Sequence, residues 1–471
     1  MRFLLLKVEE GYKKSGIFSN SKKIKSTYPP LGLEYIGSSL EKEGNKVEII
    51  DFGAEDVTLE HLKNSLIKSD AVGMSVYTNI YSIVANVAKT IKELDSNIPI
   101  IIGGPHCTHQ REKGLSQIPD ADFSIDLEGE IAILDLIKYF KGNKKISSIN
   151  GIHYRENNKI KSGKPPKVIE NLDNIPFPAR HLVEKYDYGN FLWGVRPKKK
   201  FTSMITTRGC PFKCRFCTRY GNIKEWRFRS RSPENVVKEM QEISEKYKSV
   251  MIVDDNFLTD PKRTNRIFDQ ILESKIDLEF HILGARVDTA ERELYKKMKK
   301  AGVKYISFGI ESGNQDVLDF YNKKITLPQI RKAVTLAREM NFITQGDLIL
   351  GAPIERKEHI ENTINFVSSL PLDLVLFQSL DYEKGSELWM EAVKDKKISE
   401  DEFSVKADSR RGLGHFTSEE LSNHVRKAYR KFYFNPKYLS RLFNETYKQK
   451  DLDHLKTISR LALSPLWRFV I

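Results

Sequence analysis

The sequence predicts an α/β protein with two successive regions of parallel strands and a helical C-terminal region. Short apolar, β-branched runs alternate with helical patterns from residue 1 to about residue 380. Continuous apolar strands that are joined by helices form parallel sheets covered on both faces. The chain has 471 residues, a length that corresponds to roughly two to four domains. We expect four parts, which are residues 1–145, 146–200, 201–383 and 384–471.

The composition excludes several classes of protein. Only four cysteines are present, which excludes a disulfide-rich secreted scaffold, and three of them fall at positions 210, 214 and 217. This clustering indicates a metal site in a reducing compartment, so we expect a cytoplasmic protein. No stretch reaches the roughly 18 apolar residues of a membrane span. The net charge is +14, but the lysines are spread along the chain, so we expect a solvated basic surface and no stable nucleic-acid partner.

The first region predicts a Rossmann-like (flavodoxin-like) domain. Its strand candidates are 3–8, 47–50, 71–76, 98–102 and 123–125, and helical patterns fill 33–43, 59–69, 81–94 and 131–140. Ligands of such sheets bind beyond the carboxyl ends of the strands. The loops at that edge supply the candidate binding residues Pro30, Leu31, Gly32, Tyr77, Thr78, Gly103, Gly104, Pro105, His106, Glu128 and Gly129.

A hairpin over 152–155 and 159–161 and an extended proline-containing linker over 173–178 precede the second region. Six strand candidates then follow without a return strand, at 203–207, 249–253, 279–283, 305–309, 346–350 and 374–378. Helical patterns lie between them, for example at 233–245, 261–274 and 327–339. This order predicts a partial (βα)6 barrel of the TIM type. An aromatic and basic helix over 425–434 and an amphipathic stretch over 458–471 follow.

The most specific motif is a loop with three cysteines, Cys210, Cys214 and Cys217. Three thiolates cannot complete a tetrahedral zinc site, and no fourth ligand follows nearby. They can bind three irons of a 4Fe–4S cluster and leave the fourth iron open for a substrate-like chelate. The alternatives are a structural zinc loop or three unrelated buried cysteines, and the spacing after a strand disfavours both.

This loop resembles the radical SAM superfamily, whose members bind S-adenosylmethionine (SAM) at the open iron and cleave it reductively to a 5′-deoxyadenosyl radical. The resemblance implies that Cys210, Cys214 and Cys217 bind the cluster. It also implies SAM contacts near Phe216 and at the ends of successive strands. Arg286 is suited to the SAM carboxylate through its planar fork. The implied SAM-binding set is Phe216, Asp254, Arg286, Glu311, Ser312 and Leu350.

The N-terminal region is similar to the cobalamin-binding domain of one branch of that superfamily, which includes anaerobic magnesium-protoporphyrin ester cyclases and hopanoid methylases. The similarity rests on Pro29-Pro30-Leu31-Gly32-Leu33 and Gly103-Gly104-Pro105-His106, and the tail segment 428–433 agrees with it. An Asp-x-His-x-x-Gly motif is absent, and His106 and His109 lie outside such a motif. The similarity implies that the candidate binding residues of these loops contact cobalamin. We therefore expect cobalamin that is held without a protein histidine ligand, or a domain that holds none. Cys107 is expected to be a small buried residue.

The resemblance implies an oxygen-sensitive enzyme that methylates an unactivated carbon with cobalamin and receives electrons from a reductant such as flavodoxin or ferredoxin. One alternative is cobalamin-dependent oxidative cyclisation of a tetrapyrrole, and one from another class is a basic nucleic-acid-binding iron–sulfur protein. A methylthiotransferase is disfavoured because the first region lacks that family's three extra cysteines. The substrate is expected to be a small molecule, a lipid or a tetrapyrrole. The stretch 461–471 suits either core packing or peripheral membrane contact.

Overall fold

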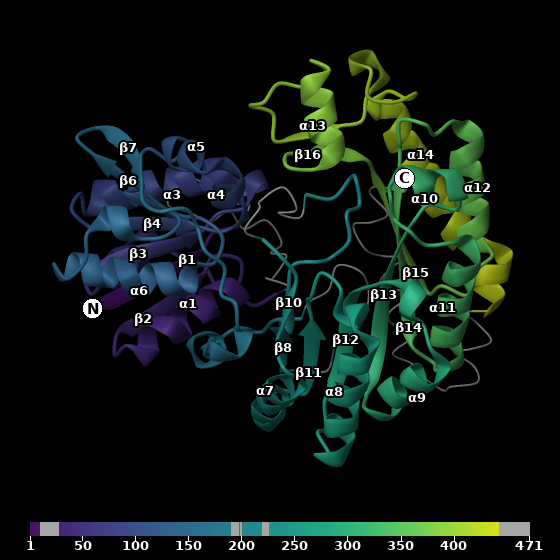
Figure 1. Cartoon of the computed structure of the whole chain (residues 1–471), viewed down its shortest axis with the longest axis horizontal. Coiled ribbons are helices and arrows are strands. Elements are labelled where there is room, and N and C mark those ends of the chain that lie inside the picture. The colour runs from purple at the N-terminus through teal and green to yellow at the C-terminus, as the bar shows by residue number, and fades with distance from the viewer. Residues whose placement is uncertain (10–27, 190–196, 198–199, 219–225, 442–471) are drawn as a thin grey trace. The chain divides into compact units, whose positions relative to one another are not determined.

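The computed structural model describes residues 1–9, 28–189, 197, 200–218 and 226–441. The chain divides into two compact units, Met1–Asn190 and Phe191–Ile471, and each contains one large sheet (Figure 1). The amphipathic stretch 458–471 lies outside the described residues. None of the helices in the described part of the chain has the length and hydrophobicity that crossing a bilayer requires.

The sheet of the first unit has the order β2-β1-β3-β4-β5-β6-β7. Its five parallel strands are β1 (Arg2–Lys7), β2 (Lys46–Asp51), β3 (Ala71–Ser75), β4 (Ile100–Gly103) and β5 (Phe123–Ile125). The predicted hairpin forms as β6 (Ile152–Glu156) and β7 (Lys159–Ser162), and β6 pairs antiparallel with β5. The hairpin therefore extends this sheet. The strand order reverses between β1 and β3, which is where open α/β sheets bind ligands.

The helices of the first unit largely match the expected positions. They are α1 (Leu31–Lys42), α2 (Leu59–Leu66), α3 (Tyr81–Leu94), α4 (Pro105–Gln110), α5 (Glu112–Ser116) and α6 (Gly129–Phe140). The sequence did not predict α4 and α5, because each is too short to show an apolar period. Arg111 separates them with a left-handed φ of 53°.

The second unit confirms the predicted partial barrel. Its six parallel strands follow sequence order, and they are β8 (Phe201–Met204), β11 (Ser249–Ile252), β12 (Glu279–Ala285), β13 (Val303–Glu311), β14 (Ile343–Leu350) and β15 (Leu374–Ser379). A short antiparallel pair, β9 (Thr207–Arg208) and β10 (Arg229–Ser230), follows β8. The connecting helices are α7 (Pro233–Lys246), α8 (Pro261–Glu273), α9 (Arg292–Lys300), α10 (Gln315–Phe320), α11 (Leu327–Glu339) and α12 (Lys357–Ser368).

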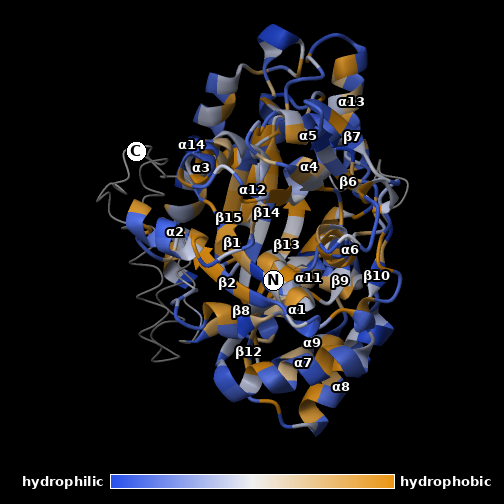
Figure 2. Cartoon of the chain, turned by 90° about the vertical axis from the view of Figure 1, so that its left-hand side faces the viewer, coloured by the Kyte–Doolittle hydropathy of each residue, from blue (hydrophilic) through white to orange (hydrophobic). Residues whose placement is uncertain are grey.

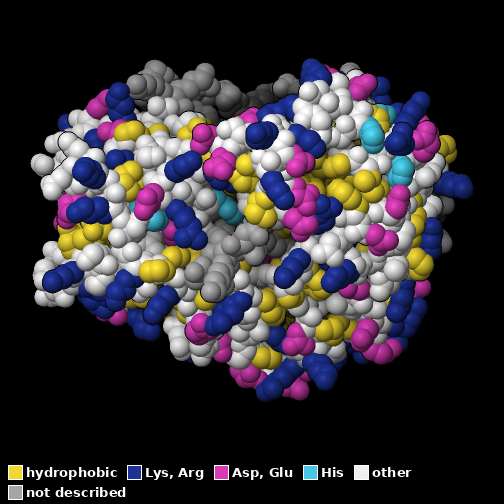
Figure 3. All heavy atoms as spheres, turned by 45° about the horizontal axis from the view of Figure 1, so that its top comes forward, with side chains coloured by type: hydrophobic (Ala, Val, Ile, Leu, Met, Phe, Trp, Pro, Cys, Tyr) yellow, Lys and Arg dark blue, Asp and Glu magenta, His cyan; other side chains and the backbone are white. Residues whose placement is uncertain are grey.

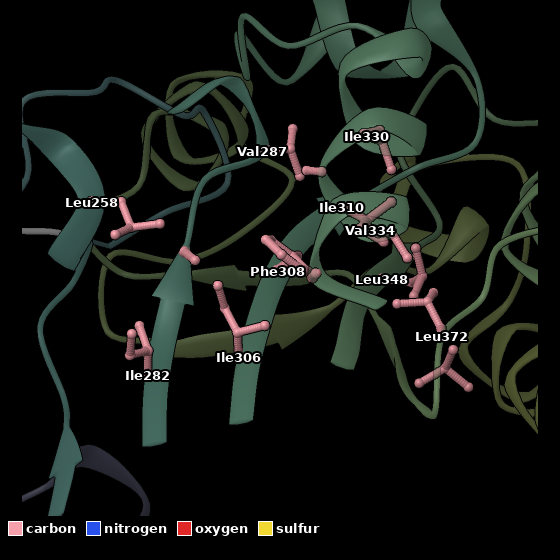
Figure 4. Close-up of a cluster of buried hydrophobic side chains, with 14 of the residues drawn as sticks. Leu258, Ile282, Val287, Ile306, Phe308, Ile310, Ile330, Val334, Leu348 and Leu372 are labelled. Atoms are coloured by element: carbon pink, nitrogen blue, oxygen red, sulfur yellow. The ribbon is translucent and has the colours of Figure 1, made fainter. Parts of the chain in front are cut away.

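The main core of this unit lies between the sheet and its helices. Strands are mostly apolar, whereas helices such as α7 and α8 show one apolar and one polar face (Figure 2). Ile306, Phe308 and Ile310 alternate along β13 and belong to the same buried cluster as Ile330 and Val334 of α11 (Figure 4). Because side chains alternate along a strand, Tyr305, Ser307 and Gly309 face the opposite side, which is the interior of the barrel.

The chain after the barrel forms α13 (Glu387–Lys394), the antiparallel pair β16 (Asp381–Glu383) and β17 (Ser404–Lys406), and α14 (Ser418–Tyr433). Helix α14 covers β15, the last strand of the sheet. The Tyr429 hydroxyl bonds the N–H and the carbonyl of Phe377 at 3.0 and 3.2 Å, and the Tyr433 hydroxyl does the same at Val375 at 3.2 and 3.4 Å. Side-chain hydroxyls thus satisfy backbone groups at the edge of the barrel sheet.

Candidate cluster and cofactor sites

The loop that carries the three cysteines leaves the carboxyl end of β8 and returns through β10. The pairing of Arg208 with Arg229 and of Thr207 with Ser230 closes its base. Gly209 begins the loop with a φ of 81°, and a Cβ there would lie 2.9 Å from the carbonyl oxygen of Arg227. Only glycine fits both the left-handed backbone and this close approach. Gly209 therefore fixes the conformation in which the loop leaves the carboxyl end of the barrel strands.

The three thiols fit a cluster better than a single ion. Cys214 is buried, while Cys210 and Cys217 are partly exposed. The Cys217 N–H donates to the carbonyl oxygen of Cys214 at 3.1 Å, so these two residues share a tight turn. In the described residues, no three His, Cys, Asp or Glu side chains converge as ligands of one metal ion would. A 4Fe–4S cluster does not need such convergence, because each thiolate binds a different iron.

The fully buried Thr206 lies between β8 and β9 and is the centre of a network of charged residues. Asp254 accepts hydrogen bonds from the Thr206 N–H at 2.6 Å and from its hydroxyl at 2.5 Å. The Thr206 carbonyl oxygen accepts from the Arg231 N–H and from Nη2 of Arg263, each at 3.0 Å. Three buried charged residues therefore hold the backbone that leads from β8 into the cysteine loop.

The segment that follows α10 also contacts the cysteine loop. The carbonyl oxygen of Tyr321 accepts from the Arg215 N–H at 3.0 Å, and the Asn322 side chain donates to the Lys213 carbonyl oxygen at 2.8 Å. The ring of Phe216 packs edge-on against Tyr321 at 4.9 Å between centroids. The sequence indicated an aromatic role for Phe216 but gave no signal for this segment.

Two of the predicted SAM-binding residues lie at the carboxyl ends of their strands, and both are already ion-paired. Arg286 is buried, makes a forked contact with Asp288 at 2.8–3.2 Å and stacks on Phe212 of the cysteine loop at 3.7 Å. Glu311 is buried, accepts from Lys323 Nζ at 2.6 Å and has a left-handed φ of 64°. Strained backbone of this kind is concentrated at functional sites.

The other predicted SAM-binding residues have clear structural partners. Asp254 bonds Thr206 through both oxygens, and the hydroxyl of the fully buried Ser312 lies 3.2 Å from that of Thr363. The Leu350 side chain is buried in the main core, so only its backbone is placed to border a ligand. Their contact with SAM stays a prediction, and the structure assigns each of them a packing or positioning contact.

Sequence reasoning missed the polar interior of the barrel. Asp347 accepts from the Ser307 hydroxyl at 2.5 Å and from the Gln345 amide at 2.7 Å. Burial raises the pKa of Asp347 to about 6, and Glu311 adds to this effect while Lys323 opposes it. A charged residue inside an apolar strand was the available signal for Asp347. Lys323 follows a short helix in an otherwise ordinary polar segment, and no sequence pattern marks it.

At the sheet edge of the first unit, His106 is fully engaged within the protein. Its Nε2 lies 2.9 Å from the side-chain oxygen of Gln117, its Nδ1 lies 3.4 Å from the hydroxyl of Thr78, and its ring stacks on Tyr81 at 4.9 Å. Both ring nitrogens of His106 therefore have partners within the first unit, and cobalamin held without a protein histidine stays a prediction. Burial raises the pKa of Cys107 to about 12, so its thiol is a packing group as expected.

The remaining candidates of this edge divide into exposed and buried groups. Tyr77 is 54% exposed just after β3 and Gly32 is exposed in the first turn of α1, so both are open to a ligand. Glu128 is buried and accepts from the Ile169 N–H, and a Cβ on Gly129 would meet Ile36 at 2.9 Å. The other candidates are buried or partly buried in their loops, and they are Pro30, Leu31, Gly103, Gly104 and Pro105.

The surface shows how the basic excess is distributed. On the face drawn in Figure 3, Lys and Arg side chains are spread widely and interspersed with Asp and Glu. On this face, opposite charges are mixed and the basic excess is not gathered in one patch.

Comparisons with known proteins agree with both halves of this description. The family model of the Radical SAM superfamily matches residues 204–367, and that of the B12 binding domain matches residues 20–137. An uncharacterised methyltransferase of Pyrococcus horikoshii is 33% identical over 425 residues, which cover 88% of this chain and 90% of the relative. An anaerobic magnesium-protoporphyrin IX monomethyl ester cyclase of Cereibacter sphaeroides is 28% identical over 73% of this chain and 57% of the relative.

Among solved structures, the cobalamin-dependent SAM radical enzyme OxsB, with aqua-cobalamin and SAM bound, superposes with a TM-score of 0.72. The match covers 96% of this chain and 72% of that one at 19% identity, so it supports the fold. The chain belongs to the radical SAM superfamily, among the members with an N-terminal B12-binding domain. It is therefore a radical SAM enzyme, and the predicted cofactors, a 4Fe–4S cluster, SAM and cobalamin, are confirmed by this membership.

Proposed function

We propose that this enzyme transfers a methyl group to an unactivated carbon of a small molecule, with Cys210, Cys214 and Cys217 as the ligands of its cluster. The observation that carries the proposal is the cysteine loop, which is held at the carboxyl end of a partial parallel barrel while the same chain contains a B12-binding domain. The best-covered relative described above is a methyltransferase, which favours methyl transfer over other radical outcomes. When bound, the cluster and SAM supply a 5′-deoxyadenosyl radical for hydrogen abstraction, and cobalamin supplies the methyl group.

The residues of this chain would bind and orient these groups. The Thr206 network and the segment after α10 fix the cysteine loop from two sides, so the thiols keep their spacing. Arg286 and Glu311 lie at the ends of β12 and β13, where barrel enzymes place their chemistry. The buried Glu311–Lys323 pair and the Asp347 carboxyl give the barrel interior a polar side suited to the polar parts of SAM or substrate.

Oxidative cyclisation of a tetrapyrrole is the second candidate, because a named relative carries out that reaction. The two candidates differ in their products. Methyl transfer carries the labelled methyl group of SAM into the product, whereas an oxidative cyclisation adds no carbon. Small molecules, lipids and tetrapyrroles can each be tested as substrates in this way.

The first experiment measures 5′-deoxyadenosine from anaerobically reconstituted and reduced protein. Wild-type protein should show cluster absorbance and should release 5′-deoxyadenosine and methionine in equal amounts. Cys214→Ala should lose both properties, because two thiolates cannot hold the cluster stably. Cys107→Ala is the matched control and should keep both, since this thiol is buried in the other unit. Equal activity in the two variants would refute the assignment of the cysteines.

The second experiment tests cobalamin and methyl transfer. Protein purified from cells supplied with cobalamin should carry about one cobalamin per chain, visible in its absorption spectrum. Reaction with methyl-labelled SAM and a small-molecule extract should place the label in a new compound. A product that lacks the label but has lost hydrogen would favour the oxidative alternative.

A further inference from the structure

Arg215, which lies between the second and third cysteines, has every polar group engaged by the protein. Its Nε donates to Glu387 at 2.8 Å, and its Nη2 donates to both oxygens of Glu391 at 2.7 and 2.6 Å. Its Nη1 donates to the Phe320 carbonyl oxygen at 3.3 Å, and the guanidinium lies 4.5 Å from the centre of the Phe320 ring. One positive charge is thus flanked by two carboxylates.

Both carboxylates belong to α13, which follows the barrel strands in the chain. Glu387 opens this helix and Glu391 lies four residues later, so the two side chains share one helical face. Ser386 caps the helix by accepting from the Trp389 N–H at 3.1 Å, which fixes its first turn. The helix lies beyond residues 204–367, which the superfamily model matches. Neither glutamate forms part of a motif in the sequence.

The backbone of Arg215 is held at the same place. Its N–H donates to the Tyr321 carbonyl oxygen at 3.0 Å, and its carbonyl oxygen accepts from the Leu388 N–H at 3.1 Å. Side chain and backbone therefore tie the turn between Cys214 and Cys217 to α13 on one side and to the end of α10 on the other. Movement of α13 would move the thiol-bearing turn with it.

We propose that Glu387 and Glu391 are positioning residues of the cluster loop, which act through Arg215 to fix the thiol-bearing turn and to set the charge beside the cluster. This inference rests on the proposed function, in which Cys214 and Cys217 bind that cluster. The flanking carboxylates turn the positive charge of Arg215 into a local net charge of about −1, which disfavours an added electron on the cluster. Removal of both carboxylates leaves the guanidinium charge uncompensated and favours the reduced cluster.

The test compares the double variant Glu387→Gln, Glu391→Gln with a control that removes an equally exposed carboxylate elsewhere. Glu234→Gln is this control, because Glu234 is 52% exposed and pairs with Arg266 at 2.5 Å, whereas Glu387 and Glu391 are 48% and 50% exposed. The reduction potential of the reconstituted cluster is measured by titration followed by electron paramagnetic resonance. The double Gln variant should favour reduction roughly tenfold more than wild type, which is about +59 mV for one electron. The control should shift the equilibrium less than twofold.

A second measurement needs no cluster. Amide hydrogen exchange of the cluster-free protein should be at least tenfold faster at Arg215 and Leu388 in the double Gln variant, and unchanged in the control. The double variant Glu387→Asp, Glu391→Asp keeps the charge, so its reduction equilibrium should lie within twofold of that of wild type. Unchanged potential and unchanged exchange in the Gln variant would overturn the inference. Wild-type protein that binds no cluster would overturn the proposed function, and the exchange rates would then decide the positioning role alone.

Discussion

Asp254 offers a sharp test of how the structure holds the cysteine loop. Its carboxylate is buried and accepts from both the N–H and the hydroxyl of Thr206, the residue four positions before Cys210. Asp254→Ala removes both acceptors and leaves two donors of Thr206 buried without partners. Asp254→Asn keeps the shape, because the amide oxygen can accept from the N–H while the amide nitrogen donates to the hydroxyl.

The expected magnitudes follow from these contacts. A hydrogen bond to a charged group contributes about 1.5–3 kcal/mol, and an unsatisfied buried donor costs a similar amount. Burial raises the pKa of Asp254, which shows that the ionised carboxylate is itself costly to desolvate and offsets part of the loss. We therefore expect Asp254→Ala to lower the free energy of unfolding by about 2–4 kcal/mol, and Asp254→Asn by about 1–2 kcal/mol.

Urea unfolding of the cluster-free protein, followed by tryptophan fluorescence, measures the free-energy changes, and iron content after reconstitution measures loop function. The Ala variant should retain less than half of the wild-type iron, and the Asn variant should retain most of it. The reasoning would be refuted if the free energy of unfolding of Asp254→Ala lay within about 0.5 kcal/mol of the wild-type value, because substitutions at neutral surface positions usually have effects of that size. It would also be refuted if the Ala variant bound iron normally.

Three further predictions concern other parts of the second unit. Burial raises the pKa of Asp347 from 3.8 to about 6 in the native state, so ionisation of this group lowers the free energy of unfolding by up to about 3 kcal/mol as the pH rises from 4 to 7. Asp347→Asn should remove that part of the pH dependence in unfolding titrations. Tyr429→Phe leaves the edge groups of Phe377 without partners and should cost about 1–3 kcal/mol in thermal or urea unfolding. Gly309→Ala would place a Cβ 2.7 Å from Oε1 of Glu311 and displace that side chain, so SAM should bind at least fivefold more weakly in equilibrium dialysis. Equal binding would show that the Glu311–Lys323 pair is remote from SAM.

Much of the fold could be predicted because it follows from local periodicity. Continuous apolar runs such as 71–76 marked buried parallel strands, and regular spacing of helices between them marked two βα regions. The hairpin was predicted as well, but its place beside β5 was not, since pairing between strands that are distant in sequence leaves no local pattern. Helices α4 and α5 were missed because one turn of helix shows no period.

The candidate site was predicted where chemistry follows from spacing and missed where it follows from tertiary contact. The cysteine spacing indicated a cluster, whereas the internal bonds of His106 to Gln117 and Thr78 could not be read from the sequence. Arg286 and Glu311 were located at strand ends, but their pairing with Asp288 and Lys323 could not be read from the sequence. The role of Glu391 depends on a helix that returns to Arg215 after more than 170 residues.

The tyrosines of α14 have a consequence for how the chain folds during synthesis. The barrel sheet is complete once β15 has left the ribosome, but its last strand stays unpaired on one side until α14 has been made. At about 5–20 residues per second, the interval lasts several seconds. During that time an exposed strand can pair with a neighbouring nascent chain. A chaperone that binds extended segments would therefore be most useful at this stage, and chains cut before residue 418 should aggregate even though every barrel strand is present.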